Sequence, residues 1–231
     1  MEAAYEIFAG EIAAKGTGYL AIRRCRTAEL GEQLSRGREE LLGLGASQLL
    51  VTSSDPEAPL FEGEWDGFSL VHARDLLWME RELTALPPHQ EEVELCPLTR
   101  GRGGTWLTLH NACFFDMPNS ATYGPLDLER ALSPEFVCGF VQHDQVPVGV
   151  YELDLSGETP VIDGIALHKD FRGRGLGKSL LSAVLELLAE RGYPCCRLLV
   201  ATDNQRAFSL YRSAGFRAEG VRSRWFQMLA K

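Results

Sequence analysis

The stretch Arg172-Gly173-Arg174-Gly175-Leu176-Gly177-Lys178 is the most informative part of the chain, because three glycines alternate with larger residues at a junction between two elements. It follows an apolar run, residues 161–167, with the character of a β-strand, and it precedes a long run with helical periodicity. Glycine lets backbone N–H groups converge without an obstructing Cβ, and a helix N-terminus adds about half a positive charge. The stretch therefore predicts a loop that binds a phosphate or pyrophosphate group.

Two familiar nucleotide-binding loops fit this stretch poorly. A Walker A loop needs a glycine where this chain has Arg172, so a P-loop nucleotide hydrolase is disfavoured. The dinucleotide fingerprint needs a glycine where the chain has Lys178. It also needs an acidic residue at the end of the next strand, and Asp203 comes too late for that role.

A third interpretation fits better. The sequence from Ile165 to Gly177 resembles the pyrophosphate loop of the GCN5-related N-acetyltransferases, in which an apolar strand leads to an Arg or Gln and alternating glycines. A second segment, with Asn204, Ala207, Tyr211 and Gly215-Phe216, is similar to that family's other cofactor-side motif. The resemblance implies an α/β fold of the α+β type, whose mixed and mostly antiparallel sheet is flanked by helices. Two central strands of that sheet would splay apart where the pantetheine arm enters.

The resemblance also implies an activity. It suggests an enzyme that moves an acetyl group from acetyl-coenzyme A to a primary amine by direct attack in a ternary complex, without a metal. Transfer of another acyl group remains open, as does a protein that only binds and senses acyl-coenzyme A. The residues implied to contact the coenzyme are Ile165, Ala166, Leu167, Arg172, Gly173, Arg174, Gly175, Leu176, Gly177, Lys178, Asn204 and Ala207.

Tyr211 is the catalytic acid that the resemblance implies, because in this family the hydroxyl at its position protonates the departing thiolate. It shares one helix face with Asn204 and Ala207. A tyrosine packed without a catalytic role is the alternative for Tyr211. Asn204 could equally be a helix N-cap. The oxyanion would be held by backbone N–H groups of residues 165–167, where we expect the strand to bulge.

The resemblance also implies Asp163 as the general base, because many members of the family carry a carboxylate on this strand that takes the proton of the amine. From the residues alone, an aspartate inside an apolar strand is paired, exposed or functional. Glu152 and Asp154 on the preceding strand are its rivals. Three scattered histidines, His110, His143 and His168, are expected to lie in the core or at the surface rather than to be catalytic.

Composition limits the partners. The net charge of −9 and the lack of a long basic run argue against nucleic acid as a partner.

The six cysteines show no CxxC pair and no metal-ligand spacing, which predicts free thiols in a reducing cytoplasm and no metal site. No apolar run approaches the roughly 20 residues that span a bilayer, so no membrane association is expected. The aromatic residues at 106–123 and in the final strands suit a small amine, an amino acid or a peptide N-terminus, and a homodimer remains open.

Two domains are predicted, a catalytic one over residues 91–231 and a degenerate, truncated half-copy of it over residues 1–90. Short blocks recur at a nearly constant offset: Gly43 corresponds to Gly192, Gly67-Phe68 to Gly215-Phe216, and Trp78 to Trp225. The half-copy keeps only one glycine in the region that corresponds to the loop, so we expect it to be structural. In the catalytic domain we expect strands at 93–98, 136–142, 146–155, 161–167 and 197–201, helices at 105–115, 126–131, 176–191 and 205–214, and two final strands.

Overall fold

The computed structural model describes residues 4–55, 57–84, 86, 92–117 and 120–231. The chain divides into two compact units. The first comprises Met1–Leu77, Ala201–Asp203 and Val221–Lys231, and the second comprises Trp78–Val200 and Asn204–Gly220. The predicted domain boundary at residues 90 and 91 lies outside the described residues, so that division stays a prediction.

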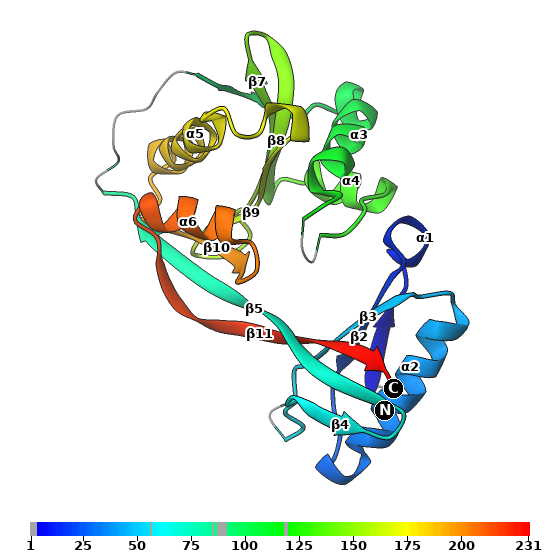
Figure 1. Cartoon of the computed structure of the whole chain (residues 1–231). Helices are drawn as coiled ribbons and strands as arrows, with labels where there is room; N and C mark the ends of the chain where they lie inside the picture. The colour runs from blue at the N-terminus through cyan, green and yellow to red at the C-terminus, as the bar shows by residue number, and fades with distance from the viewer. Residues whose placement is uncertain (1–3, 56, 85, 87–91, 118–119) are drawn as a thin grey trace. The chain divides into compact units, whose positions relative to one another are not determined.

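The first unit is a sheet covered by one long helix (Figure 1). Its strands follow the order β1-β2-β3-β11-β5, and β4 pairs with the start of β5. Leu30, Leu34 and Leu41 on α2 are buried against the sheet, as the helical spacing requires. The elements are β1 (Tyr5–Phe8), α1 (Ile12–Lys15), β2 (Thr17–Ile22), α2 (Leu30–Gly43), β3 (Gln48–Ser53), β4 (Gly63–Trp65), β5 (Phe68–Glu82) and the last part of β11 (Arg217–Ala230).

The second unit contains the glycine-rich stretch. Its strands follow the order β5-β10-β9-β8-β7-β6, antiparallel from β6 to β9 and parallel between β9 and β10. Helices α3 and α4 lie on one side of β7–β9 and α5 lies on the other (Figure 1). The elements are β6 (Glu94–Pro97), α3 (Gly103–Phe114), α4 (Pro125–Ala131), β7 (Phe136–His143), β8 (Val146–Asp154), β9 (Val161–Leu167), α5 (Leu176–Glu190), β10 (Cys195–Ala201) and α6 (Gln205–Ser213).

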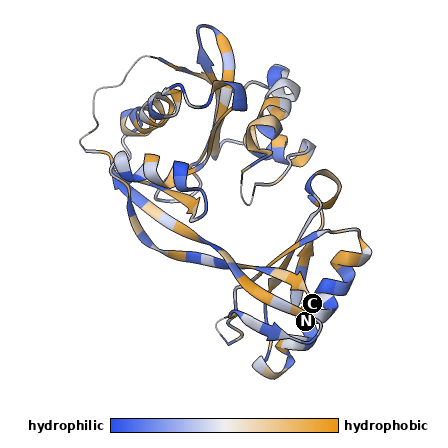
Figure 2. Ribbon diagram, in the orientation of Figure 1, coloured by the Kyte–Doolittle hydropathy of each residue, from blue (hydrophilic) through white to orange (hydrophobic). Residues whose placement is uncertain are grey.

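The predicted mixed sheet with flanking helices is confirmed. Strand β9 has the expected bounds, and α5 carries a buried face that includes Leu180, Leu181, Val184 and Leu188. Figure 2 shows this helix with apolar and polar residues alternating along its ribbon, as an amphipathic helix does. Within the described residues, none of the helices has the length and apolar character needed to cross a membrane.

Two local predictions were wrong. Helix α3 begins at Gly103 rather than Thr105, because a 3₁₀ turn at Arg100–Arg102 leads directly into it. The two final strands are one continuous strand, β11, since no turn interrupts residues 217–230. The hairpin between β7 and β8 turns at Asp144 and Gln145, which have φ of 50° and 66°. Two consecutive positive φ angles match the turn that suits the right-handed twist of the strands.

Both units contain a strand, a helix and a second strand parallel to the first. In the first unit β2 and β3 pair over their whole lengths, from Thr17 with Gln48 to Ile22 with Ser53. In the second unit β9 and β10 pair only at Val161 and Ile162. The rest of β9 therefore lacks ladder partners on the β10 side, as the expected splay requires. The descent of the two units from one repeat stays a prediction.

Candidate functional site

The glycine-rich stretch forms the turn between β9 and α5. Gly173 has φ 82° and Gly175 has φ 90°, both in the left-handed region that side chains disfavour. Gly175 is the N-cap of α5 and has no side chain, so the first turn of the helix has no side-chain cap, although the N–H of Lys178 donates to the carbonyl oxygen of Gly175. A Cβ at Gly175 would meet no atom within 4 Å. This open helix N-terminus is a site for an anion.

Three cationic side chains lie in the turn, in the first turn of α5 and in α6. Arg174 stacks on the ring of Phe171 at 5.3 Å, and Lys178 lies in the first turn of α5. Arg206 on α6 was not among the sequence candidates, yet its Nη2 lies 3.9 Å from the position of a Cβ on Gly173. The exposed Arg206 therefore adds positive charge beside the turn. Its place two positions after Asn204, at the start of a helix, was the signal that sequence reasoning overlooked.

Arg172 has partners different from those expected. Its guanidinium donates to the carbonyl oxygen of Leu167, to that of Cys113 and to both carboxylate oxygens of Asp116. The Arg172 side chain is only 18 % exposed. Its donors are thus directed at the ends of β9 and α3.

The second motif lies at the start of α6 and along it. The Oδ1 atom of Asn204 accepts a hydrogen bond of 3.2 Å from the backbone N–H of Ala207, so Asn204 is the N-cap of this helix. The ring of Tyr211 packs at 5.8 Å from that of Phe216. Burial raises the pKa of Tyr211 to about 12, which keeps its hydroxyl protonated at neutral pH. That hydroxyl makes no hydrogen bond with any of the described residues.

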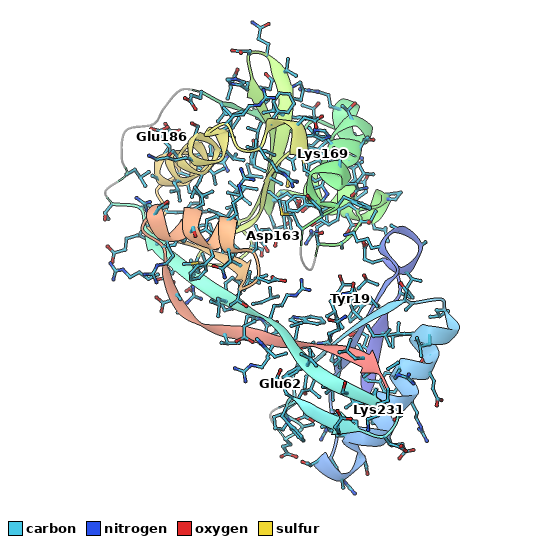
Figure 3. All side chains as sticks on the ribbon, in the orientation of Figure 1. Tyr19, Glu62, Asp163, Lys169, Glu186 and Lys231 are labelled. Atoms are coloured by element: carbon cyan, nitrogen blue, oxygen red, sulfur yellow. The ribbon has the colours of Figure 1, made fainter. Side chains whose placement is uncertain are left out.

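The predicted bulge lies two residues earlier than expected. Ile165, Ala166 and Leu167 pair regularly with β8, so the bulge expected there was wrong. Glu152 faces Gly164 and the next residue of β8 faces Ile162, which leaves Asp163 as the extra residue. Figure 3 shows Asp163 on β9 and Lys169 just past the end of that strand.

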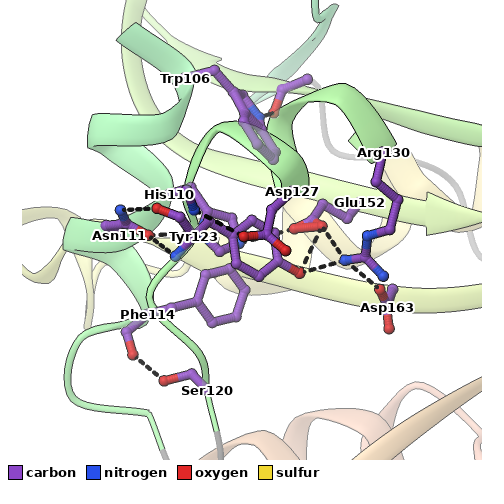
Figure 4. Close-up of polar contacts among 12 residues, drawn as sticks. Trp106, His110, Asn111, Phe114, Ser120, Tyr123, Asp127, Arg130, Glu152 and Asp163 are labelled. Carbon is purple, nitrogen blue, oxygen red and sulfur yellow. Dashed lines mark hydrogen bonds and ion pairs between the residues drawn. The ribbon is translucent and has the colours of Figure 1, made fainter. Parts of the chain in front are cut away.

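Five side chains from α3, α4, β8, β9 and the segment between the two helices form one polar cluster (Figure 4). In this polar cluster His110 Nε2 lies 2.9 Å from Glu152 Oε1, and Tyr123 donates to Glu152 Oε2 at 3.3 Å. Arg130 donates to the Tyr123 hydroxyl at 2.8 Å and lies 3.7 Å from Asp163. The rings of His110 and Tyr123 are stacked at 3.9 Å. A network of this kind fixes each member's orientation.

The two carboxylates of the polar cluster differ in access. The side chain of Glu152 is 2 % exposed, whereas that of Asp163 is 38 % exposed. Partial burial, and then repulsion from Glu152, raises the pKa of Asp163, while Arg130 opposes that rise. Burial beside Glu152 also raises the pKa of Tyr123, so this tyrosine stays a neutral donor. Asp163 is therefore the carboxylate that can meet a second molecule.

The prediction of a structural role for His110 was correct in part. This residue is buried, as a structural role requires, but its partner Glu152 makes it a member of the polar cluster. His143 and His168 contact Asp144 and Asp170 near the surface. The pairing of His110 with Glu152 joins positions on different elements, and no local sequence signal indicates it.

The described residues offer little support for catalysis by a cysteine thiolate or by a metal ion. Burial raises the pKa of Cys113 and that of Cys196 to about 12, so neither is a thiolate at neutral pH. All six cysteines are free. Among the described residues, no group of three or more His, Cys, Asp or Glu side chains could hold a metal ion.

Comparison with known proteins identifies the second unit. Residues 104–216 match the model of the acetyltransferase (GNAT) family. A mycothiol acetyltransferase of Clavibacter sepedonicus is 32% identical over 167 residues, which are 68% of this chain and 55% of that protein. The N-alpha-acetyltransferase RimI of Mycobacterium tuberculosis is 35% identical over 85 residues, 35% of this chain and 52% of that protein. The chain thus spans about half the length of these relatives.

A solved structure supports the fold of the whole chain. The GCN5-related N-acetyltransferase from Sphaerobacter thermophilus superposes with a TM-score of 0.65, covering 98% of this chain and 76% of the other. The two sequences are 18% identical, so this likeness concerns the fold alone.

Proposed function

Because the chain belongs to the acetyltransferase (GNAT) family through residues 104–216, we propose that its second unit transfers an acetyl group from acetyl-coenzyme A to a primary amine. The observation that carries the proposal is the open N-terminus of α5 beside the unpaired edge of β9. Acetyl-coenzyme A is an extended thioester with a pyrophosphate at one end. It needs an anion site for the pyrophosphate and, beside that site, an unpaired strand edge for the extended arm. Gly173 and Gly175 let the backbone approach the pyrophosphate, and Lys178 and Arg206 add charge.

The transfer forms a C–N bond and breaks a C–S bond. The amine must lose one proton as it attacks, and the departing thiolate must gain one. Asp163 is suited to accept the first proton, because it is the exposed carboxylate of the polar cluster. Tyr211 is suited to supply the second, because its hydroxyl is protonated and has no partner among the described residues. Backbone N–H groups of residues 165–167, which lack ladder partners on the β10 side, are suited to hold the oxyanion.

The polar cluster favours a cationic acceptor. Glu152 and Asp163 contribute two carboxylates to it, and Arg130 contributes one guanidinium. An ammonium group is drawn to such a site. The exposed Asp163 can take one proton from it and release that proton to solvent, and the neutral amine then attacks and gives its next proton to Asp163. The names of the relatives suggest a small amine or a protein N-terminus, and we propose an acceptor from one of these two classes.

We further propose that the first unit holds no second coenzyme site. Its strands β2 and β3 pair over their whole lengths, which closes the edge that β9 leaves open. Residues 23–29 between β2 and α2 contain no glycine. Binding should therefore saturate at one acetyl-coenzyme A per chain.

Calorimetric titration with acetyl-coenzyme A tests the proposal, beside ATP and beside the variant Gly175→Glu. A carboxylate at the α5 N-terminus should abolish binding, whereas the matched change Gly157→Glu in the β8–β9 loop should preserve it. Turnover is then followed by mass spectrometry with small primary amines and with short peptides. Preference for ATP, or binding unaffected by Gly175→Glu, would refute the proposed site. Binding without turnover of any amine would favour a sensor.

A further inference from the structure

The side chain of Arg172 connects two parts of the second unit. Its Nε donates to Leu167 O at 2.9 Å, and its Nη2 donates to Cys113 O at 2.7 Å. Nη1 and Nη2 also bind the Asp116 carboxylate at 2.6 and 3.0 Å, in a two-pronged contact. Leu167 ends β9, while Cys113 and Asp116 lie at the end of α3 and just after it.

Each of these contacts has a physical reason. The carbonyl of Cys113 is among the last four of α3, which have no partner inside the helix. A cation at a helix C-terminus is also favoured by the helix dipole. The planar guanidinium can satisfy two carbonyls and a carboxylate at once, which the single ammonium of lysine cannot. Hydrogen bonding to Arg172 lowers the pKa of Asp116, so this carboxylate stays ionised.

Helix α3 carries part of the polar cluster. His110 lies one turn before the end of α3, and Phe114 at its end packs against β9, where a Cβ on Gly164 would come within 2.9 Å of the Phe114 ring. A shift of α3 relative to β9 would therefore displace His110 and Phe114 from Asp163. Arg172 joins the ends of these two elements by hydrogen bonds to the carbonyl oxygens of Leu167 and Cys113.

Resting on the proposed function, we propose that Arg172 is a positioning residue that holds the acceptor-side helix α3 against the donor-side turn, rather than a ligand of the coenzyme phosphates. Its charge is already matched by Asp116, and its backbone N–H donates to Lys169 O at 3.3 Å. Four of the five N–H groups of this guanidinium already donate to Leu167, Cys113 and Asp116, which leaves one for a phosphate. Arg174, Lys178 and Arg206 remain for the phosphates.

Two acetyl donors distinguish a positioning role of Arg172 from a role as a ligand of the phosphates. Acetyl-coenzyme A carries the phosphates, whereas S-acetylpantetheine has the same thioester and no phosphate. Steady-state turnover with each donor is compared for the unaltered protein and for Arg172→Gln, Asp116→Asn and the double variant. Arg172→Lys keeps the charge without the planar fork, and Arg206→Gln is the matched loss of an arginine beside the turn. Thermal unfolding and the affinity for acetyl-coenzyme A are measured for every variant.

A positioning role predicts that Arg172→Gln lowers kcat on the order of 100-fold with both donors, since small misplacements of reacting groups cost about that much. The affinity for acetyl-coenzyme A should change less than about threefold, and the KM for the amine should rise. Asp116→Asn should show the same pattern, the double variant should be no worse than Arg172→Gln, and Arg172→Lys should not restore activity. Arg206→Gln should lose activity with acetyl-coenzyme A only.

Two results would overturn the inference alone. One is a loss in Arg172→Gln that is confined to acetyl-coenzyme A and is restored by Arg172→Lys. The other is full activity of Asp116→Asn, a change at an exposed side chain. Absence of binding and of turnover in the unaltered protein would instead overturn the proposed function, and this inference with it.

Discussion

Replacing Arg130 with Gln should move the acidic limb of the pH–activity profile to higher pH. The Nη2 atom of Arg130 lies 3.7 Å from Asp163 Oδ2. At that distance two unit charges interact by about 1 kcal/mol in water and about 4.5 kcal/mol at an effective dielectric of 20. Both side chains are about 40 % exposed, which places the effect near the lower value. Loss of Arg130 should therefore raise the pKa of Asp163 and lower kcat/KM at acidic pH by about fivefold, which corresponds to about 1 kcal/mol.

The direction follows from the groups that face Asp163. Glu152 and Asp154 raise the pKa of this carboxyl, while Arg130 and His110 lower it, so removing Arg130 leaves the raising effects less opposed. A base must be deprotonated to accept a proton, and a higher pKa therefore removes activity at low pH while preserving it at high pH. The assay follows loss of thioester absorbance and reads kcat/KM for the amine from pH 5 to 9.

Arg100→Gln is the matched control, because Arg100 is an exposed arginine paired with Glu129 on the same unit. It should leave the acidic limb in place. An unchanged limb in Arg130→Gln would refute Asp163 as the base, and so would an intact limb in Asp163→Asn. Equal shifts in Arg130→Gln and Arg100→Gln would show that the net charge of the protein, not the 3.7 Å contact, determines the pH of the acidic limb.

Three further outcomes are expected. Tyr211→Phe should lower kcat by about 10²- to 10³-fold and leave the affinity for acetyl-coenzyme A unchanged, since only the proton donor is lost; unchanged kcat would exclude Tyr211 as the acid. Cys113→Ala should keep turnover within about tenfold, with no acyl-enzyme seen by mass spectrometry, because burial keeps this thiol protonated. Gly139→Ala should lower the free energy of unfolding in urea by roughly 2–3 kcal/mol, because a Cβ there would collide with the carbonyl oxygen of Cys96 and the Tyr151 hydroxyl; an unchanged midpoint would contradict this.

Local chemistry explains what the sequence predicted well. The bounds of β9 and the start of α5 follow from an apolar run, a glycine-rich turn and helical spacing, all within about 30 consecutive residues. Gly192 has φ 84° just after α5, as expected for the glycine that follows a helix. Asn204 as the cap of α6 depends only on its own neighbours. Such features need no knowledge of distant parts of the chain.

The partners of charged side chains could not be predicted in this way. No sequence pattern indicated that the side chain of Arg172 binds Asp116, which is 56 positions away. His110 was expected to be structural, yet it lies 2.9 Å from Glu152 in the polar cluster. A charged side chain has several donors or acceptors, and packing decides which partners they reach.

The sequence by itself determined the family, the glycine turn and most of the elements, because these depend on residue types at short spacings. Only the tertiary structure decided where the bulge at Asp163 falls and which carboxylate is accessible. It also decided that Val221–Lys231 completes the first unit, where β11 pairs with β3. Strand register and ion-pair choice are set by contacts between residues far apart in the chain, and no local pattern encodes them.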